Sequence, residues 1–501
     1  MTEVNDVEIY DATGKLLSIT KPTGLKTALT YNANGQLSTV TDPFGRQLSF
    51  NYDGVGRISQ ISDASGGTYA YSYDLKGNLR AVNYPNGVAK TYHYENTAFP
   101  SALTGITDEN GIRYATYAYD VTGRAISTQH AGGAEHYILS FGTNSTVVTD
   151  PLNTNRTDTF QIILGVAKHT GSSQPGGSGC GPAASALTYD PNNGNIATRT
   201  DFNGNLTTYD YDLTRNLEKK RVEASGKPET RTISTQWHAY WRLPTKVAEP
   251  KKLSTWVYNG DTDPSTGSVL TCAPSSATVP SITGGTVPIG VLCKQSEQST
   301  TDANGSTGFT ATVSGLPRTW TYTYNAYGQV LTADGPRTDV SDVTTTTYYA
   351  PTDPDLGKRG NLATVTNALG HVTQITAYDL NGNPLTIIDP NNVTTTLTYT
   401  PRGWLKSRTV GTELTGYKYD DVGQLTRVTQ PDASTLTFTY DDAHRLTDLT
   451  DNLGNTVHYT LDAAGNRRNE TIKDPWGTLT RQITRVYDAL GRLQTVTGAR
   501  Q

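Results

Sequence analysis

Short polar turns divide the chain into segments in which apolar and polar residues alternate. Every second residue is large and apolar in the segments Leu48–Phe50–Tyr52, Tyr69–Tyr71–Tyr73, Tyr92–Tyr94 and Tyr117–Tyr119. A spacing of two is typical of a strand with one buried face. No long segment shows a helical period. The pattern therefore predicts an all-β fold.

The turns recur at a fixed interval. A tyrosine followed by Asp or Asn, two variable residues and Gly stands at Tyr10, Tyr31, Tyr52 and Tyr73, a step of 21 residues. Asp at the first and Gly at the fourth position, as in Asp11–Gly14, are typical of a type I turn. A second turn such as Asp42–Gly45 lies halfway along each repeat. The two remaining segments have strand length, so each repeat is predicted to be a β-hairpin.

The repeat signature is the tyrosine together with the glycine of its turn. Its best copies are Tyr10 with Gly14, Tyr31 with Gly35, Tyr52 with Gly56, Tyr73 with Gly77, Tyr119 with Gly123, Tyr324 with Gly328, Tyr378 with Gly382, Tyr419 with Gly423, and Tyr487 with Gly491. Leu461 replaces the tyrosine in one copy. This predicts that the position needs a large apolar side chain more than a phenol.

The strand that leaves each turn is less regular. Leu37 and Val40 are three residues apart, as are Ile58 and Ile61, so the two members of each pair have opposite parity. Either a β-bulge or burial on both faces would explain this spacing. The residues alone leave both explanations open.

The spacing of the repeats divides the chain into five parts. They are N-terminal repeats at 1–130, irregular strands with a Gly/Ser-rich loop at 131–188, repeats at 189–250, a Ser/Thr/Gly-rich insertion with two cysteines at 251–316, and C-terminal repeats at 317–501. A chain of this length exceeds an ordinary single core, whereas repeats need to pack only on their neighbours.

Composition and net charge indicate which kinds of fold and partner the sequence favours. The chain has 30 Tyr but 8 Phe, 48 Gly and 35% hydrophobic residues, which suits many turns and thin cores. A net charge of -5, scattered along 501 residues, favours neither nucleic acid nor an anionic membrane as partner. No apolar run is long enough to span a membrane, and residues 1–14 lack the features of a signal peptide. Because both ends fall at or within repeats, we interpret the chain as a piece of a longer protein.

Tyr-Asp-x-x-Gly-[Arg/Gln/Asn]-Leu, seen at Tyr73–Leu79, Tyr419–Leu425 and Tyr487–Leu493, closely resembles the YD repeat of the RHS family. That family includes bacterial polymorphic toxins, toxin-complex C proteins and teneurins. The resemblance implies a spiralling β-sheet that forms part of a hollow shell. In many bacterial members the shell encloses a C-terminal toxin, which a core with two DPxG motifs cuts free. The chain shows no such core and no toxin-like tail.

Two motifs resemble catalytic ones. Asp42–Gly45 and Asp474–Gly477 look like DPxG, but both occupy the mid-repeat turn, and no feature of the sequence places the two carboxyls together. Cys180 and the residues after it resemble the nucleophile box of papain-like peptidases, but a strand and turn follow where a helix is needed. His169 and His238 are the nearest histidines in sequence. We therefore predict no catalytic residue and no enzyme activity.

Two further motifs concern structure or metal. Cys272 and Cys293 flank a small Pro/Gly-rich loop, and either a disulfide or two reduced thiols are compatible with the sequence. Asp190–Asn195 has a passing likeness to a calcium loop, but its glycine is one place early and no helices flank it. A repeat turn explains it better. We predict no metal and no cofactor.

The tyrosine ladder could be a carbohydrate-stacking surface, but period-two rings more often form the buried face of a sheet. The face could point to the cavity or to solvent. The sequence thus favours a non-catalytic shell segment whose partners are the remaining shell and an enclosed C-terminal toxin or other cargo polypeptide. A carbohydrate-binding or cell-surface adhesion module is the alternative. Either function implies a secreted or cell-surface protein.

Overall fold

The computed structural model of the chain describes residues 5–498. Residues 1–4 and 499–501 belong to the predicted N-terminal and C-terminal repeats and lie outside the described residues. The segment 1–14, which is predicted not to be a signal peptide, includes residues 1–4 and so lies partly outside the described residues.

Within the described residues the chain is almost entirely β-strand. The first strands are β1 (Val7–Tyr10), β2 (Leu16–Thr20), β3 (Lys26–Tyr31), β4 (Leu37–Thr41), β5 (Gln47–Tyr52), β6 (Ile58–Ser62), β7 (Thr68–Tyr73), β8 (Leu79–Asn83), β9 (Ala89–His93), β10 (Gly105–Thr107), β11 (Arg113–Tyr119) and β12 (Ala125–His130). There follow β13 (Tyr137–Gly142), β14 (Ser145–Thr149), β15 (Asn155–Ile163), β16 (Val166–Gln174), β17 (Ala183–Tyr189), β18 (Ile196–Thr200), β19 (Leu206–Asp212), β20 (Leu217–Glu223), β21 (Arg231–Trp237), β22 (Pro244–Glu249) and β23 (Lys252–Tyr258).

The second half continues in the same way. Its strands are β24 (Thr278–Pro280), β25 (Thr286–Pro288), β26 (Leu292–Thr300), β27 (Val313–Tyr324), β28 (Val330–Asp334), β29 (Thr344–Tyr348), β30 (Leu362–Thr366), β31 (Val372–Tyr378), β32 (Pro384–Ile388) and β33 (Thr394–Tyr399). The last are β34 (Leu405–Val410), β35 (Glu413–Tyr419), β36 (Leu425–Thr429), β37 (Thr435–Tyr440), β38 (Leu446–Asp451), β39 (Thr456–Leu461), β40 (Arg467–Lys473), β41 (Leu479–Tyr487) and β42 (Leu493–Thr497). Two short 3-10 helices, Ala131–Gly133 and Gly308–Thr310, interrupt them.

All strands except β24 and β25 form one 40-stranded sheet, in which each strand pairs antiparallel with the next along the chain. β24 and β25 make a separate two-stranded sheet. The predicted all-β hairpin array is therefore confirmed. The parts 131–188 and 251–316, which look irregular in sequence, also supply main-sheet strands, β13 to β17 and β23, β26 and part of β27. The excursion from the sheet is confined to the segment between Tyr258 and Leu292.

The question of the irregular strand is settled by the register. Thr30 pairs with Thr39, but Tyr31 pairs with Leu37, which leaves Ser38 as an extra residue. The same one-residue shift precedes Tyr52 and Tyr73. A β-bulge therefore brings Leu37 and Val40 to one face, and burial on both faces is not needed.

Each signature turn is held by the aspartate or asparagine at its first position. The Oδ1 atom of Asp53 accepts hydrogen bonds from the backbone N–H of Val55 and of Arg57, at 3.0 and 2.9 Å. The glycine that ends the turn has a left-handed φ, which is 89° at Gly56. The other signature glycines share this conformation: Gly14, Gly35, Gly77, Gly123, Gly328, Gly382, Gly423 and Gly491.

The signature tyrosines join successive hairpins through their hydroxyl groups. The hydroxyl of Tyr31 donates to the carbonyl oxygen of Leu16 at 2.8 Å, one hairpin back along the chain. Every other signature tyrosine except Tyr10 also donates to a backbone carbonyl: Tyr52, Tyr73, Tyr119, Tyr324, Tyr378, Tyr419 and Tyr487. The interpretation drawn from Leu461, that bulk matters more than the phenol, stays a prediction, although the hydroxyl is hydrogen-bonded in these repeats.

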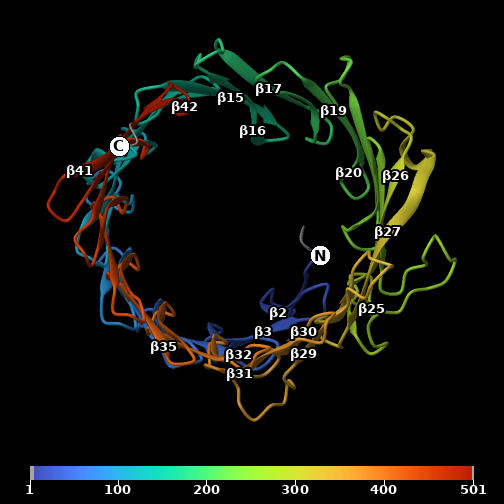
Figure 1. Cartoon of the computed structure of the whole chain (residues 1–501). Coiled ribbons are helices and arrows are strands. Elements are labelled where there is room, and N and C mark those ends of the chain that lie inside the picture. The colour runs from blue at the N-terminus through green and yellow to red at the C-terminus, as the bar shows by residue number, and fades with distance from the viewer. Residues whose placement is uncertain (1–4, 499–501) are drawn as a thin grey trace.

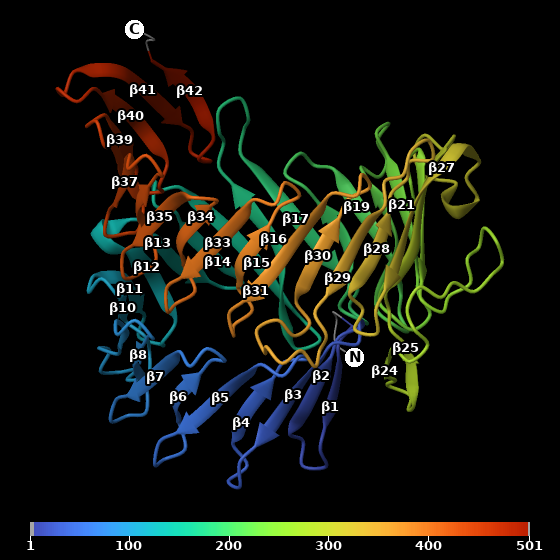
Figure 2. The ribbon, with the colours of Figure 1, turned by 60° about the horizontal axis from the view of Figure 1, so that its bottom comes forward.

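The sheet curves around a central axis and passes over its own beginning (Figure 1). In Figure 2 the strands from β28 onward lie as a second circuit above β1 to β9. The wall is a single sheet thick, and the cluster around Trp241 and Val279 is its main fully buried hydrophobic core among the described residues. No helix of the described part is long and apolar enough to cross a membrane.

Candidate functional site: the seam between two circuits

The two kinds of turn lie on opposite edges of the sheet, because consecutive strands are antiparallel. We call the turn after a signature tyrosine a tyrosine turn, and the turn halfway along a repeat a mid-repeat turn. Where the circuits overlap, mid-repeat turns of the first circuit contact tyrosine turns of the second. The residues that form hydrogen bonds between these turns are 293 to 336 positions apart in sequence. We call this line of contact the seam.

A buried carboxylate lies at the centre of the seam. Glu109, in the mid-repeat turn 108–111, has a side chain that is 2% exposed. Its carboxylate lies 3.0 Å from the guanidinium of Arg402, in a tyrosine turn of the second circuit, and 3.6 Å from Nζ of Lys90. The Arg402 guanidinium stacks 4.0 Å from the ring centre of Tyr84 and 4.5 Å from that of Trp404. Burial, and then the charge of Glu109, raise the pKa of Tyr84 to about 12.

A second buried carboxylate stands next to the first. Oδ2 of Asp108 lies 2.7 Å from Nε2 of His444, which belongs to the tyrosine turn 441–444. The ring of Tyr114 stacks between two imidazoles, 4.2 Å from His444 and 4.4 Å from His130. Removing one partner of a buried ion pair is costly, whereas the intact pair adds little net stability. Each contact joins the two circuits, so a change in how the circuits stack would separate a buried carboxylate from its partner.

Apolar contacts supply the rest of the seam. Phe44, at the third position of the mid-repeat turn 42–45, packs with its ring centre 5.8 Å from that of Tyr327. A Cβ atom on Gly360 would overlap the Phe44 ring, so a side chain at this position would require the ring to shift. Leu380, at the second position of a tyrosine turn, lines a cavity of about 250 Å³ with Val40 and Leu48.

The upper end of the seam holds the free cysteine. The backbone N–H of Ser178 donates to the Asp488 carboxylate at 2.9 Å. Burial opposes ionisation of Asp488, but this bond and the donors of Arg492 outweigh it and lower the pKa of the carboxyl. Arg492 also lies 3.1 Å from Sγ of Cys180. The hydrogen bond from Gly177, together with Arg492, lowers the pKa of the Cys180 thiol.

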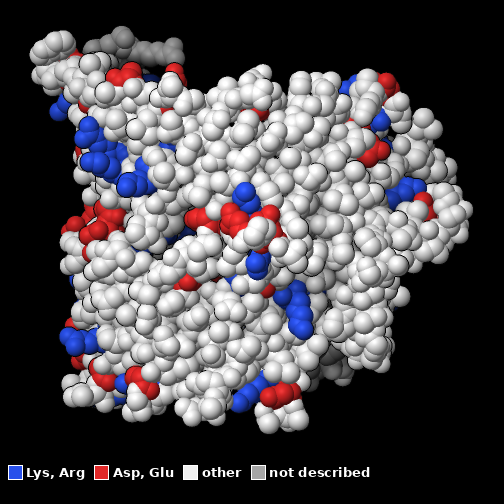
Figure 3. All heavy atoms as spheres, turned by 90° about the horizontal axis from the view of Figure 1, so that it is seen from below, with Lys and Arg blue, Asp and Glu red and all other residues white. Residues whose placement is uncertain are grey.

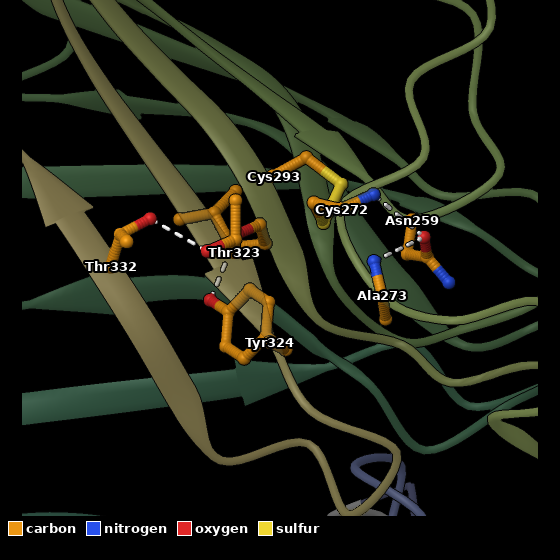
Figure 4. Close-up of a disulfide and its surroundings, with 8 residues drawn as sticks. Asn259, Cys272, Ala273, Cys293, Thr323, Tyr324 and Thr332 are labelled. Atoms are coloured by element: carbon orange, nitrogen blue, oxygen red, sulfur yellow. Dashed lines mark hydrogen bonds between the residues drawn. A yellow bond between two sulfur atoms is a disulfide. The ribbon is translucent and has the colours of Figure 1, made fainter. Parts of the chain in front are cut away.

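The excursion of the chain after β23 packs on the beginning of the first circuit. A disulfide joins Cys272 and Cys293, and the side chain of Asn259 accepts hydrogen bonds from the N–H of Cys272 and Ala273 (Figure 4). Trp241, Val279 and Ile289 form a buried cluster beside the disulfide. The N–H of Gly290 donates to the carbonyl of Pro22 at 2.8 Å, which ties the excursion to the mid-repeat turn below it.

The aspartates of the two DPxG-like motifs have structural partners within their own turns. Each DPxG aspartate accepts N–H bonds from its own turn, Asp42 from Phe44 and Arg46, and Asp474 from Trp476 and Thr478. The structure does not bring the two carboxylates into contact.

The cysteine, the histidines and the calcium-loop aspartate singled out in the sequence also have structural contacts. The partners of Cys180 are Gly177 and Arg492, whereas His169 contacts Asp158 and Ser172. His238 lies 3.2 Å from Asp261. The carboxylate of Asp190 accepts hydrogen bonds from the backbone N–H of Asn192 and the side-chain amide of Asn193, both in its own turn. Residues 5–498 contain no cluster of three or more His, Cys, Asp or Glu that could hold a metal ion.

The sequence did not reveal Glu109, Arg402 or His444. Their local sequences are ordinary turns, and their partners are 293 or more residues away. On the side of the molecule shown in Figure 3, charged side chains are sparse, and Lys or Arg and Asp or Glu occur there in small neighbouring groups.

Comparison with known proteins agrees with this architecture. The RHS repeat family model matches residues 10–47, 52–89, 378–413, 419–456 and 440–479. A structure of the Photorhabdus luminescens Tc holotoxin pore, which contains TccC3, superposes with a TM-score of 0.58 at 14% identity, covering 96% of this chain and 26% of that chain. A TcdB2–TccC3–Cdc42 crystal structure superposes with a TM-score of 0.59 at 16% identity, again covering 96% and 26%. At these identities the likeness shows the fold. The chain spans about a quarter of the length of these relatives. No curated protein is significantly similar in sequence.

Proposed function

From the RHS repeats that the chain contains, we propose that it is a section of a shell wall that encloses a cargo polypeptide. The observation that carries the proposal is the seam. A curved sheet that only wound past itself would leave a gap between circuits. Here the Glu109–Arg402 ion pair, the Asp108–His444 hydrogen bond and the packing of Phe44 on Tyr327 join the circuits where they meet.

Containment follows from the physics of such a wall. Within the sheet each interior strand pairs on both edges, so the backbone offers no unpaired edge through which another chain could thread. The signature hydroxyls bond each hairpin to the one before, and the seam does the same between circuits. A polypeptide inside would be separated from proteases by this layer. The wall itself would catalyse nothing.

The partners would be the remaining segments of the shell and the cargo. One relative of known structure is described as a Tc holotoxin pore, and we infer for this chain a toxin-type cargo and a secreted or surface location. The alternative, carbohydrate binding or adhesion through tyrosines, has less support. The signature tyrosines donate their hydroxyl hydrogens to backbone carbonyls inside the wall, so these hydrogens are not available to a sugar.

Small-angle X-ray scattering tests the hollow form in solution. A compact chain of 501 residues would have a radius of gyration near ~23 Å. A hollow wall should give a clearly larger value and a distance distribution weighted toward long vectors. A value near the compact limit would count against the shell.

Containment needs a second experiment. An unstructured reporter peptide placed after Gln501 should be digested more slowly on the wild-type chain than on a chain whose seam is weakened at Arg402. Equal digestion rates, with scattering still showing a hollow wall, would leave the architecture standing and remove the containment role.

A further inference from the structure

One segment shows which face of the sheet is turned outward. Residues 301–312, drawn in yellow, lie outside the ring of strands in Figure 1. Within this segment the ring centre of Phe309 lies 5.7 Å from Nζ of Lys246. A Cβ atom on Gly308 would lie 3.6 Å from the hydroxyl of Ser234. The segment therefore packs on the outward face of β21 and β22.

Lys246 and Ser234 lie on the face opposite the signature tyrosines. Trp237 takes the place of the tyrosine in β21, since its Nε1 donates to the carbonyl oxygen of Glu218, in the strand before, at 2.8 Å. Ser234 is three residues before Trp237, and Lys246 is the register partner of Gln236, so alternation along β21 puts both on the other face. The face that carries the signature tyrosines, which we call the signature face, is therefore turned inward.

One hollow on this inward face is built by both circuits. A cavity of about 250 Å³ is lined by Thr27, Val40 and Leu48 of the first circuit and by Leu380 of the second. Val40 and Leu48 are register partners on the signature face. Leu48 and Leu380 remain 43% and 41% exposed. We call this cavity the seam pocket. Its walls belong to the seam and not to an open edge of the sheet.

The charged groups around the seam pocket already have partners. The carboxylate of Asp42 accepts a hydrogen bond from Nε of Arg46 at 2.7 Å, and that of Asp63 accepts one from the N–H of Ser65. The same N–H also donates to the side chain of Asn381 at 3.2 Å, across the seam. The seam pocket thus offers a ligand apolar side chains within a rim whose charges are satisfied, which suits an apolar group better than an ion.

We propose that the seam pocket binds a large apolar side chain, such as tryptophan, of an unfolded cargo polypeptide. The inference rests on the proposed function, because it takes a polypeptide to be the occupant of the interior. An apolar cavity of about 150 Å³ holds benzene, so the volume here is enough for an indole ring. Burying the ring would also cover Leu48 and Leu380. Folded proteins keep most of their tryptophan surface inside, whereas an unfolded chain exposes it, so the seam pocket favours cargo held unfolded.

Leucine-methyl NMR of the full chain, titrated with a short Gly/Ser peptide that carries one tryptophan, tests the proposal. The methyl resonances of Leu48 and Leu380 should shift and saturate together. Those of Leu414 should not move, since Leu414 is 52% exposed but lies five residues before Tyr419 in β35 and so on the outward face. The same peptide with serine in place of tryptophan should shift none of them.

Two variants place a charge in the seam pocket, one from each circuit. Leu48→Asp and Leu380→Asp should each weaken binding of the tryptophan peptide at least about tenfold, read from the remaining leucine. Leu414→Asp is the matched control and should bind as the wild type does. All three leucines are partly exposed, so the three variants should keep the wild-type circular dichroism spectrum.

The proposal is overturned if the peptide shifts neither methyl, if it shifts leucines throughout the chain equally, or if either pocket variant binds as tightly as the wild type. It is also overturned if free indole shifts the two methyls while the peptide does not, because the opening would then exclude a polypeptide. The titration needs no enclosed cargo, so these results leave the shell role to the digestion experiment, which decides it separately.

Discussion

The hydroxyl of Tyr52 donates a hydrogen bond of 2.8 Å to the carbonyl oxygen of Leu37, and Leu37 is the register partner of the preceding signature tyrosine, Tyr31. The bond therefore lands on the bulge of the previous hairpin, where the regular ladder shifts by one residue. Each tyrosine stabilises the irregular point of its neighbour, and a single sheet with little core gains a contact between repeats.

Tyr52→Phe tests this bond. The ring remains while the hydroxyl and its bond are lost, so we expect a loss of about 1 kcal/mol in the free energy of unfolding, measured with urea. Tyr69→Phe is the control, since the hydroxyl of Tyr69 makes no hydrogen bond within residues 5–498. If both variants lose the same amount, the bond between repeats contributes nothing.

Gly360→Ala tests the packing of Phe44. Both Gly360 and Gly370 have a left-handed φ, 66° and 81°, so alanine at either should cost about 1 kcal/mol in backbone strain. Only at Gly360 does the new Cβ meet the Phe44 ring. We expect Gly360→Ala to lose about 1–3 kcal/mol more than Gly370→Ala and to speed amide exchange in the turn 42–45. Equal losses would mean that Phe44 moves aside freely.

The hairpins could be predicted from the sequence because their turns depend on local residues. Asp53 and Gly56 define a turn whichever circuit they belong to, and the spacing of Leu37 and Val40 already required a bulge or a second buried face. The role of the tyrosine hydroxyl was not readable, because Leu461 showed that an apolar residue is tolerated and the acceptor is a backbone atom of another repeat.

The contacts of the seam could not be predicted from the sequence, for a different reason. Phe44 and Trp476 stand in near-identical motifs, yet one is packed and the other exposed. Only the curvature of the whole sheet decides which turn meets another circuit, and curvature is the sum of small twists over many strands. Glu109 and Arg402 are therefore neighbours that no local pattern could pair.

Acid should weaken the wall through its turns. The side-chain bond from Thr122, then the N–H and guanidinium of Arg124, lower the pKa of Asp120, and hydrogen bonds likewise lower the pKa of Asp11 and Asp53. A carboxyl with a lowered folded pKa stabilises the fold above its unfolded pKa, near ~3.9, and loses that effect as pH falls through the folded pKa. We therefore expect stability to fall as pH drops below about 4.

Asp120→Asn provides the check on this pH dependence. Asparagine keeps the acceptor oxygen, as Asn32 does in its own turn, but does not titrate in this range. Urea midpoints of the variant should depend less on pH below 4 than those of the wild type. Parallel curves for the two proteins would show that Asp120 does not contribute to the acid sensitivity.

Loss of the disulfide should loosen the excursion. Cys272 and Cys293 close a loop of sequence separation 21, and removing such a constraint destabilises by about 3 kcal/mol in the chain-entropy account. We expect Cys272→Ser to lower the thermal midpoint and to speed amide exchange at Gly290, whose N–H bonds Pro22. Cys180→Ser should leave both unchanged. Slow exchange at Gly290 in the first variant would mean that the cluster around Val279 holds the excursion unaided.

Arg402→Met should open the seam. The substitution keeps an apolar chain over Tyr84 but leaves the Glu109 carboxylate, 2% exposed, with Lys90 alone. Uncompensated charge of this kind destabilises by about 3–5 kcal/mol, whereas Arg337→Met, which breaks an exposed pair with Asp339, should have little effect on stability. Adding Glu109→Gln to Arg402→Met removes the buried charge and should restore part of the loss in urea unfolding. If the double variant is no more stable than Arg402→Met, the damage comes from lost packing on Tyr84 and Trp404, and the ion pair does not set the register of the circuits.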